Sequence, residues 1–267
     1  MTSQSQPNEP ADFESLMGTG SQGQTIVKAL PMLVPETILQ HDAEKRRIKE
    51  SILAETDEQW VFEKTLYLPY LDFTYQYSAV RGFFSKRTVQ AQGRSIVLAL
   101  REVDLDFYPE LAALAPLMIH LRSGLDSVVQ GVDSTVLVEE RLEELKAMLS
   151  LYDNQLLELS KQYESLPLTD PLRQDLKDNI DHLRNTRETR LRMFADGLKL
   201  PANVNLDTVE FLEGDLFYMP YFIVRFARGG ELRFLVWDRE GKPNESIADE
   251  LNKNSKFREL ILSHAAS

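Results

Sequence analysis

An uninterrupted heptad pattern in the middle of the chain restricts the possible fold more than any other feature. Between Val138 and Tyr163, apolar residues recur at alternating steps of four and three, and most residues between them are charged or carry amides. The series comprises Val138, Leu142, Leu145, Leu149, Tyr152, Leu156, Leu159 and Tyr163. This spacing predicts an α-helix that buries a narrow apolar seam against another helix.

A second helix is predicted directly after the first. The segment ESLPLTDP, residues 164–171, interrupts the heptads, and Asp170 followed by Pro171 is typical of a helix start. A looser apolar stripe follows, with Arg187 inside it. Its members are Leu172, Leu176, Ile180, Leu183, Leu191, Phe194 and Leu198. The connection is so short that the helices must be antiparallel neighbours, and residues 131–200 are therefore predicted to form an antiparallel coiled-coil hairpin.

The charges of the two helices are complementary. The first helix opens with an acidic block, Glu139–Glu144, and the second ends with a basic block, Arg184–Arg192. Folding the hairpin about Pro167 is expected to bring these blocks together at its base. Each exposed ion pair stabilises by only about 0.2–1 kcal/mol, so the pairing is expected to set the register of the helices more than their stability.

An unusual aromatic phrase centred on proline occurs on both sides of the predicted hairpin. It is LYLPYLDFTYQY at 66–77 and FYMPYFIVRFAR at 217–228. Alignment of the two copies pairs Leu66 with Phe217, Tyr67 with Tyr218, Pro69 with Pro220 and Tyr70 with Tyr221. Apolar residues alternate in both copies, as in half-buried strands, and a turn and a further strand follow each. We therefore predict two related antiparallel β units, with the prolines at strand starts, edges or bulges.

The fold class predicted from these patterns is α+β. Helices are expected to flank the β units: one from Pro35 to Glu58, one from Pro109, and a short C-terminal helix capped by Ser246 with Asp249. The first β unit is expected to be a meander of about three strands. The predicted organisation is a flexible tail at 1–25, a first β unit with its helices at 26–130, the hairpin at 131–200, and a second β unit with the C-terminal helix at 201–267.

Composition excludes several classes of function. With 30 basic and 42 acidic residues the net charge is -12, which disfavours nonspecific binding to nucleic acids and to anionic membranes. The chain has no cysteine, so disulfides, thiolate nucleophiles, zinc ribbons and iron–sulfur clusters are excluded. The most apolar run, Leu111–Ile119, is much shorter than the roughly 20 residues of a membrane span. The N-terminal sequence lacks the basic and apolar regions of a signal peptide, so we expect a cytoplasmic protein without a membrane span.

Residues with catalytic or ligand-binding chemistry form no specific motif. Gly18–Thr25 matches G-x-G-x-x-G, but no strand precedes it, and Gln24 stands where a phosphate-binding loop has lysine. The histidines show no metal-binding spacing, so no metal or cofactor is predicted. Glu102, Asp104 and Asp106 would share one face of a strand and could hold Mg²⁺, although a solvated strand face is the preferred interpretation.

The leading functional hypothesis is a non-enzymatic scaffold or adaptor. At the turn of the hairpin, Leu166 and Leu168 have no obvious local partner, and exposed apolar groups on a rigid arm suggest contact with a protein partner, such as an ATPase, or with a second copy of the chain. One alternative is an accessory subunit of a nucleic-acid-processing or ATPase machine that uses Lys45–Lys49 or Arg184–Arg192. Another is an enzyme with a carboxylate site between the two β repeats.

Overall fold

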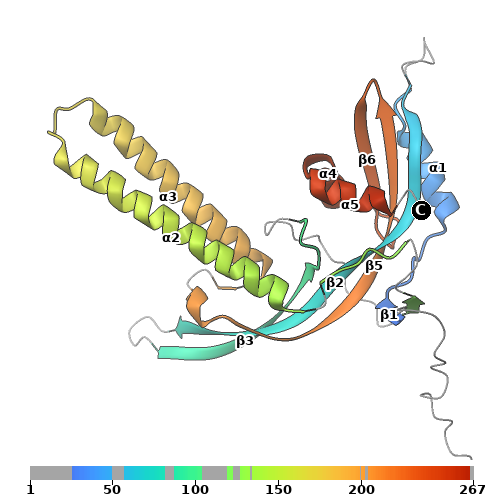
Figure 1. The fold of residues 1–267 in the computed structure, drawn as a ribbon, viewed down its shortest axis with the longest axis horizontal. Helices are drawn as coiled ribbons and strands as arrows, with labels where there is room; N and C mark the ends of the chain where they lie inside the picture. Colours follow the sequence, from blue (N-terminus) through green and yellow to red (C-terminus); the bar gives the residue numbers. More distant parts are fainter. Residues whose placement is uncertain are drawn as a thin grey trace, which may run out of the picture.

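The computed structural model describes residues 26–49, 57–81, 87–103, 119–122, 127–132, 134–198, 200–201 and 204–264. It is an α+β structure, as predicted, in which helices pack on one mixed β-sheet (Figure 1). The tail at 1–25, the carboxylates Asp104 and Asp106, and the first part of the helix predicted from Pro109 lie outside the described residues. The later part of that predicted helix was wrong, because residues 119–122 form a strand and residues 127–132 are not helical.

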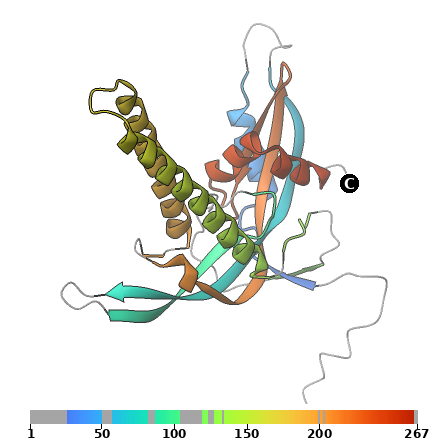
Figure 2. The same ribbon diagram turned by 60° about the vertical axis from the view of Figure 1, so that its left-hand side comes forward.

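Two long antiparallel strands, β2 and β5, form the centre of the sheet. The strands are β1 (Ile26–Ala29), β2 (Gln59–Arg81), β3 (Arg87–Leu98), β4 (Ile119–Arg122), β5 (Glu210–Arg228) and β6 (Glu231–Trp237). β3 pairs with one end of β2, and β6 pairs with the opposite end of β5. β1 lies parallel to the middle of β5 and antiparallel to β4. The central pair is strongly curved, so the two ends of the sheet face different directions (Figures 1 and 2).

Helices cover both faces of this sheet. They are α1 (Glu36–Arg46), α2 (Val136–Ser165), α3 (Leu172–Gly197), the 3-10 helix η3 (Leu206–Thr208), α4 (Glu245–Lys253) and α5 (Ser255–Ser263). α4 and α5 pack on the face that carries Leu66, Leu68 and Tyr70. α1 and the base of α2 pack on the opposite face, at opposite ends of the sheet. Beyond that base, α2 and α3 run side by side in opposite directions and project from the body (Figures 1 and 2); we call this projecting pair the arm.

The two copies of the aromatic phrase pair with each other. In the register of β2 and β5, Leu66 lies opposite Tyr221, Tyr67 opposite Pro220, Leu68 opposite Met219, Pro69 opposite Tyr218, and Tyr70 opposite Phe217. The pairing is therefore reciprocal: each residue of one copy lies opposite the residue at the mirrored position of the other copy, and Leu68 and Met219 are at the midpoint. This pairing forms the centre of the sheet.

Both prolines lie inside a continuous strand, where sequence reasoning did not expect them. Pro69 accepts a hydrogen bond from the Ala99 amide, so its nitrogen faces the outer side of β2. On that side, residues 127–129 are hydrogen-bonded to Tyr67, just before the proline, and β3 pairs with β2 from Tyr70 onward. Pro220 likewise lies between the contact of β5 with β1 and its contact with β6. The missing N–H therefore falls at a break in the outer pairing, where a proline is tolerated.

The hydrogen bonds flanking the two copies also correspond. The Val129 amide donates to Tyr67 O at 3.0 Å, and the Leu30 amide donates to Tyr218 O at 2.8 Å. Three residues further along each segment, the Val132 amide donates to Ala99 O and the Leu33 amide donates to Arg239 O, both at 2.9 Å. One segment leads into α2 and the other into α1. In the first half, β1 runs parallel to β5 and is followed by α1 and the hairpin of β2 and β3. In the second half, residues 127–129 run parallel to β2 and are followed by the arm and the hairpin of β5 and β6.

Two tyrosine hydroxyls meet in the core near this centre. Tyr70 and Tyr221 are fully buried, and their hydroxyl oxygens are 2.7 Å apart. Burial raises the pKa of both, so both stay protonated at neutral pH.

Removing both of these hydroxyls should cost less than the sum of the costs of removing each one alone. We expect Tyr70→Phe to destabilise the fold by about 1–3 kcal/mol, because the Tyr221 hydroxyl then loses its partner inside the core. In Tyr70→Phe/Tyr221→Phe no such hydroxyl remains, so its cost should be smaller than the sum of the single costs. Urea unfolding of the four proteins measures this coupling, and additive costs would contradict it.

Three further local predictions were wrong. The helix predicted from Pro35 to Glu58 ends at Arg46, because Arg47 is extended and the Glu58 carboxylate accepts the Ile48 amide at 2.8 Å. The predicted meander of about three strands is, in the described residues, the hairpin of β2 and β3. The C-terminal helix is two helices, and Asn244, which accepts the Ile247 amide at 2.9 Å, caps the first in place of Ser246.

Candidate protein-binding site

The base of the arm is fixed firmly to the sheet. The α2 seam residues up to Leu149 are buried in one cluster with Phe73 and Tyr75 of β2 and Phe194 of α3. Hydrogen bonds close the junction, because the Tyr75 hydroxyl donates to Leu198 O and the Ser95 hydroxyl donates to Gly197 O at 3.0 Å. The arm is therefore a rigid projection of the body and not a separately tethered module.

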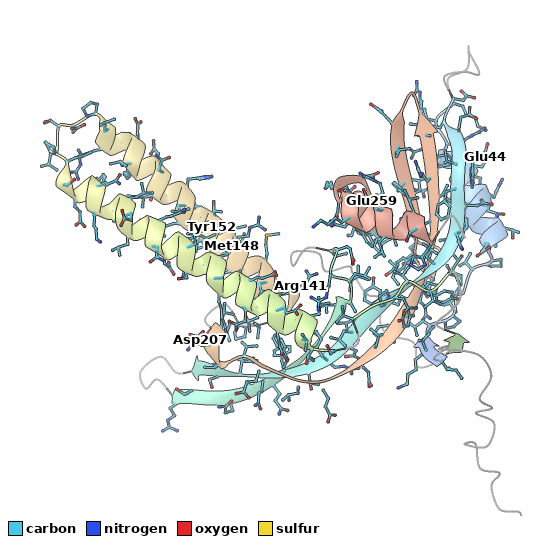
Figure 3. The ribbon with its side chains drawn as sticks, in the orientation of Figure 1. Glu44, Arg141, Met148, Tyr152, Asp207 and Glu259 are labelled. Carbon is cyan, nitrogen blue, oxygen red and sulfur yellow. The ribbon has the colours of Figure 1, made fainter. Side chains whose placement is uncertain are left out.

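Further out, the helices bury their seam only against each other. From Tyr152 onward the α2 seam is half-buried, and on α3 Ile180 is buried while Leu176 and Leu183 are half-buried. Figure 3 shows Met148 and Tyr152 one turn apart on α2, where the arm leaves the body. A helix pair with no third layer leaves apolar surface exposed along its flanks.

The charged blocks contact several different partners. Arg187 of the basic block forms a two-pronged pair with Asp153 of α2, with Nε–Oδ1 at 2.7 Å and Nη2–Oδ2 at 3.0 Å. In the acidic block, Glu140 pairs with Arg101 of the body, and Glu143 pairs with Lys146 one turn along α2. The pair between Arg187 and Asp153 joins the two helices and therefore helps to fix their register.

The turn at the end of the arm is ordered by polar contacts. Arg173 donates to Leu166 O at 2.7 Å, and its guanidinium carbon lies 4.1 Å from the centre of the Tyr163 ring. Asp170 accepts the Leu172 amide at 2.9 Å and so caps α3. These contacts order the turn and leave Leu168 exposed.

The two leucines proposed for partner binding differ in exposure. Leu168 is 87% exposed and lies in the turn between α2 and α3, whereas Leu166, the residue directly after α2, is half-buried. Leu168 is therefore the stronger candidate for contact, and Leu166 supports the turn that presents it.

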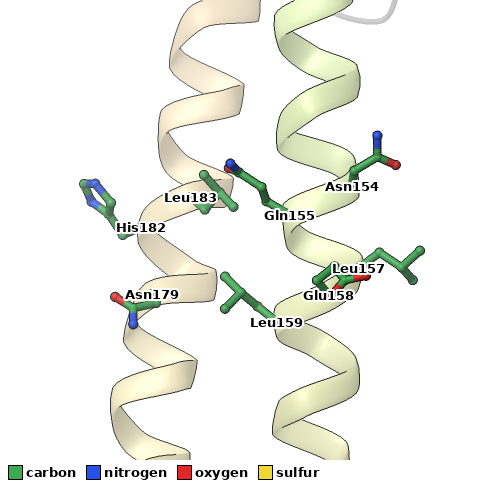
Figure 4. A pocket seen from close by; sticks show the side chains of 8 residues that line it. All are labelled: Asn154, Gln155, Leu157, Glu158, Leu159, Asn179, His182 and Leu183. Carbon is green, nitrogen blue, oxygen red and sulfur yellow. The ribbon is translucent and has the colours of Figure 1, made fainter.

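A shallow groove of ≈ 620 Å³ lies along the arm and was not anticipated from the sequence. It is lined by Asn154, Gln155, Leu157, Glu158 and Leu159 of α2 and by Asn179, His182 and Leu183 of α3 (Figure 4). The only sequence signal for it is the run of amide side chains beside the heptad seam. His182 lies at the edge of this groove (Figure 4).

The second basic segment, Lys45–Lys49, is occupied by local ion pairs. Arg46 pairs with Asp42 at 3.0 Å, and Glu44 pairs with both Arg47 at 3.0 Å and Lys49 at 2.7 Å. The hydrogen bond from Lys49 is the largest influence lowering the pKa of Glu44. This segment does not present an isolated positive surface, so it offers little support for a nucleic-acid site.

No metal-binding group is found in the described part of the chain. Within it, no group of three or more His, Asp or Glu side chains is placed to hold a metal ion. Of the three carboxylates considered for Mg²⁺, the described one, Glu102, is in a turn after β3. No helix among the described residues is long and apolar enough to cross a membrane.

Comparison with known proteins does not assign the chain to a family. No protein-family model matches it, and no curated protein or solved structure is significantly similar to it.

Proposed function

We propose that the protein is a non-enzymatic scaffold or adaptor that binds a protein partner through the end of its arm. The observation that carries this proposal is Leu168, a large apolar side chain that is 87% exposed on an ordered turn. Such a side chain at the end of a rigid projection is suited to fill a pocket on another protein. The rigid base supports the same conclusion, because it fixes the distance between the body and whatever the arm binds.

Two finer features belong to this proposal. We infer that α2 and α3 form a coiled coil, since the heptad seam continues along the outer arm. We also infer that the two halves of the sheet arose by internal duplication. Reciprocal pairing of the aromatic phrases and the matching hydrogen bonds around them support this origin. The arm then occupies the place in the second half that the short helix α1 holds in the first. A cytoplasmic location suits a chain without cysteine.

Replacing both tip leucines tests the proposal. We expect Leu166→Ser/Leu168→Ser to abolish capture of the partner when tagged protein is purified from its native host, because the apolar anchor is lost. The fold should survive, since neither side chain belongs to the buried core. Circular dichroism and urea unfolding check this point.

A matched control removes exposed leucines elsewhere. Leu212→Ser/Leu232→Ser changes two leucines of the sheet that are 37% and 40% exposed, and it should leave capture intact. Unchanged capture by the folded tip variant would refute the role of the tip. Loss of capture in both variants would point to a general effect of surface hydrophobicity.

A further inference from the structure

One long edge of the sheet is open. β3 forms a margin of the sheet, and among the described residues none pairs with its outer side (Figures 1 and 2). All 12 residues of β3 pair with β2 in one continuous register, and the strand contains no proline or lysine. Natural sheets usually protect an exposed edge with such residues, with a bulge or with a short strand. An edge of this length is therefore suited to pair with a further strand.

The corresponding strand in the other half of the sheet is shorter and partly covered. β6 has seven residues. On its outer side, the Asn244 amide donates to Val236 O at 2.8 Å, and Pro243 forms a bridge with Trp237. The open edge is therefore a feature of β3 and is not shared by the two hairpins.

The backbone groups that β3 presents at this edge follow from its pairing with β2. The Pro69 carbonyl accepts the Ala99 amide on the outer side of β2, so the odd-numbered residues of β2 direct their backbone groups towards β3. These residues lie opposite odd-numbered residues of β3, such as Ala91 opposite Tyr77. The even-numbered residues of β3 therefore direct their N–H and C=O groups outward. They are Thr88, Gln90, Gln92 and Arg94 in the exposed part of the strand.

The side chains of this edge suit an antiparallel copy of the same strand. From Thr88 to Gly93 the strand carries no charge, and Gln90 and Gln92 flank Ala91 symmetrically. Antiparallel pairing about Ala91 places Gln90 of one copy opposite Gln92 of the other, and both direct their backbone groups outward, as the pairing requires. Amide side chains both donate and accept hydrogen bonds, so the contact is complementary to itself.

Charges at the ends of this pairing are also complementary. The same register places Arg87 of one copy opposite Ser95 of the other, on the face that the base of the arm covers. The Ser95 hydroxyl donates to the carbonyl of Gly197, the last residue of α3. In its last turn α3 carries Asp196 and no basic residue. The carboxyl end of a helix and a carboxylate both favour a cation, so Arg87 of one copy supplies the charge that α3 of the other lacks.

We infer that two copies of this chain pair along their β3 edges, in antiparallel orientation and with Ala91 at the twofold axis. Charge supports a second copy as the occupant. The net charge of -12 makes two copies repel across most of their surfaces, whereas β3 has two arginines and no carboxylate. Arg94 is already paired with Asp72, with Nε–Oδ1 at 2.7 Å, and lies on the opposite face from Arg87. The inference goes beyond partner capture at the tip, because it concerns the body.

The length of the edge predicts a weak dimer. The residues from Arg87 to Ser95 extend about 30 Å at roughly 3.4 Å per residue. A contact along one strand of this length is smaller than a standard protein interface. We therefore expect association that depends strongly on concentration.

Sedimentation velocity of the full chain, purified without any partner, tests the inference. We expect the weight-average mass to rise from one chain towards two between about 5 and 500 µM, consistent with a small interface. Ala91→Glu and Ala91→Lys should each stay monomeric, because like charges then meet at the axis. An equimolar mixture of the two should dimerise again, because opposite charges meet there. Leu232→Glu is the matched control: it adds the same charge at a 40% exposed residue of β6 and should leave the dimer intact.

Single cysteines give an independent measurement, because the chain has none of its own. At the axis the two Ala91 Cα atoms are expected to lie about 4.5 Å apart, which is within the range of a disulfide. Ala91→Cys should therefore form a disulfide-linked dimer on oxidation. Val89→Cys lies on the same face and is the control, since the two copies of residue 89 are offset by about 13 Å along the strands.

Four outcomes decide against the inference. A chain that stays monomeric at about 500 µM, a concentration at which even a small interface should associate, would overturn it, as would a dimer that Ala91→Glu leaves unchanged. Pairing about Ala91 is wrong if the mixture of the Glu and Lys variants stays monomeric, or if Val89→Cys cross-links as readily as Ala91→Cys. Because no partner is present, these outcomes are separate from those of the capture experiment.

Discussion

Replacing Glu58 with alanine is expected to destabilise the protein by about 3 kcal/mol, because it breaks a largely buried ion pair. The Glu58 side chain is 5% exposed, and that of its partner Arg233 is 32% exposed. Arg233 donates from Nε at 2.7 Å and from Nη2 at 2.5 Å, and the carboxylate also accepts the Ile48 amide. Without the carboxylate, the Ile48 amide loses its acceptor, and the guanidinium loses its ion pair and retains the Arg46 carbonyl oxygen, which accepts from Nη2 at 3.0 Å. The change should appear as a lower midpoint of urea unfolding.

Glu44→Ala is the matched control for this result. Glu44 also pairs with two basic residues, but its side chain is 41% exposed. Exposed pairs contribute about 0.2–1 kcal/mol, so this variant should unfold close to the wild type. Equal costs for the two variants would show that the burial of Glu58 does not matter.

The contribution of Glu58 should also depend on pH. Burial by itself raises the pKa of Glu58, but the hydrogen bonds from Arg233 and the Ile48 amide outweigh it, and the pKa lies below its ordinary value of 4.5. A carboxyl whose pKa is lowered by folding stabilises the fold above its unfolded pKa and loses this effect as pH falls through the folded pKa. The stability difference between wild type and Glu58→Gln should thus be constant from pH 7 to about 4.5 and shrink below it.

Phe194→Ala is expected to cost about 3–5 kcal/mol and to loosen the arm from the body. Phe194 is 1% exposed and packs in the cluster that joins α2, α3 and β2. Truncation leaves a cavity at the point where the arm is fixed, and the surrounding helices can close it only in part. Urea unfolding measures the cost, and faster hydrogen exchange at the base of α3 would show where it acts.

The neighbouring residue provides the comparison. Met193 is 38% exposed, so Met193→Ala should change stability by less than about 0.5 kcal/mol. If Phe194→Ala were as mild as this control, the base of the arm would not depend on its core packing.

Local patterns in the sequence predicted the helices of the arm well. The heptads from Val138 to Tyr163 lie within α2, and the stripe that begins at Leu172 opens α3. Gly229 and Gly230 likewise form the predicted turn between β5 and β6, with φ of 58° and 89°. These signals lie within a few residues of the structure they determine.

Contacts between distant residues could not be predicted in the same way. The repeated phrase indicated two related units, but not that the copies would pair with each other. The segments Leu30–Leu33 and Val129–Val132 make corresponding backbone hydrogen bonds, but their amino-acid sequences are dissimilar. The pair of Glu58 with Arg233 and the contact of the two buried tyrosines join residues 175 and 151 positions apart.

The reciprocal pairing of β2 with β5 has a consequence for biosynthesis. β2 and β3 leave the ribosome long before β5, and the whole arm is made between them. The α2–α3 pair is stabilised by contacts close in sequence, which form quickly, whereas the central strand pairing must close a loop of more than a hundred residues. The arm should therefore be complete while β2 still has an unpaired edge. Newly made chains are then most prone to aggregate in the interval before β5 arrives.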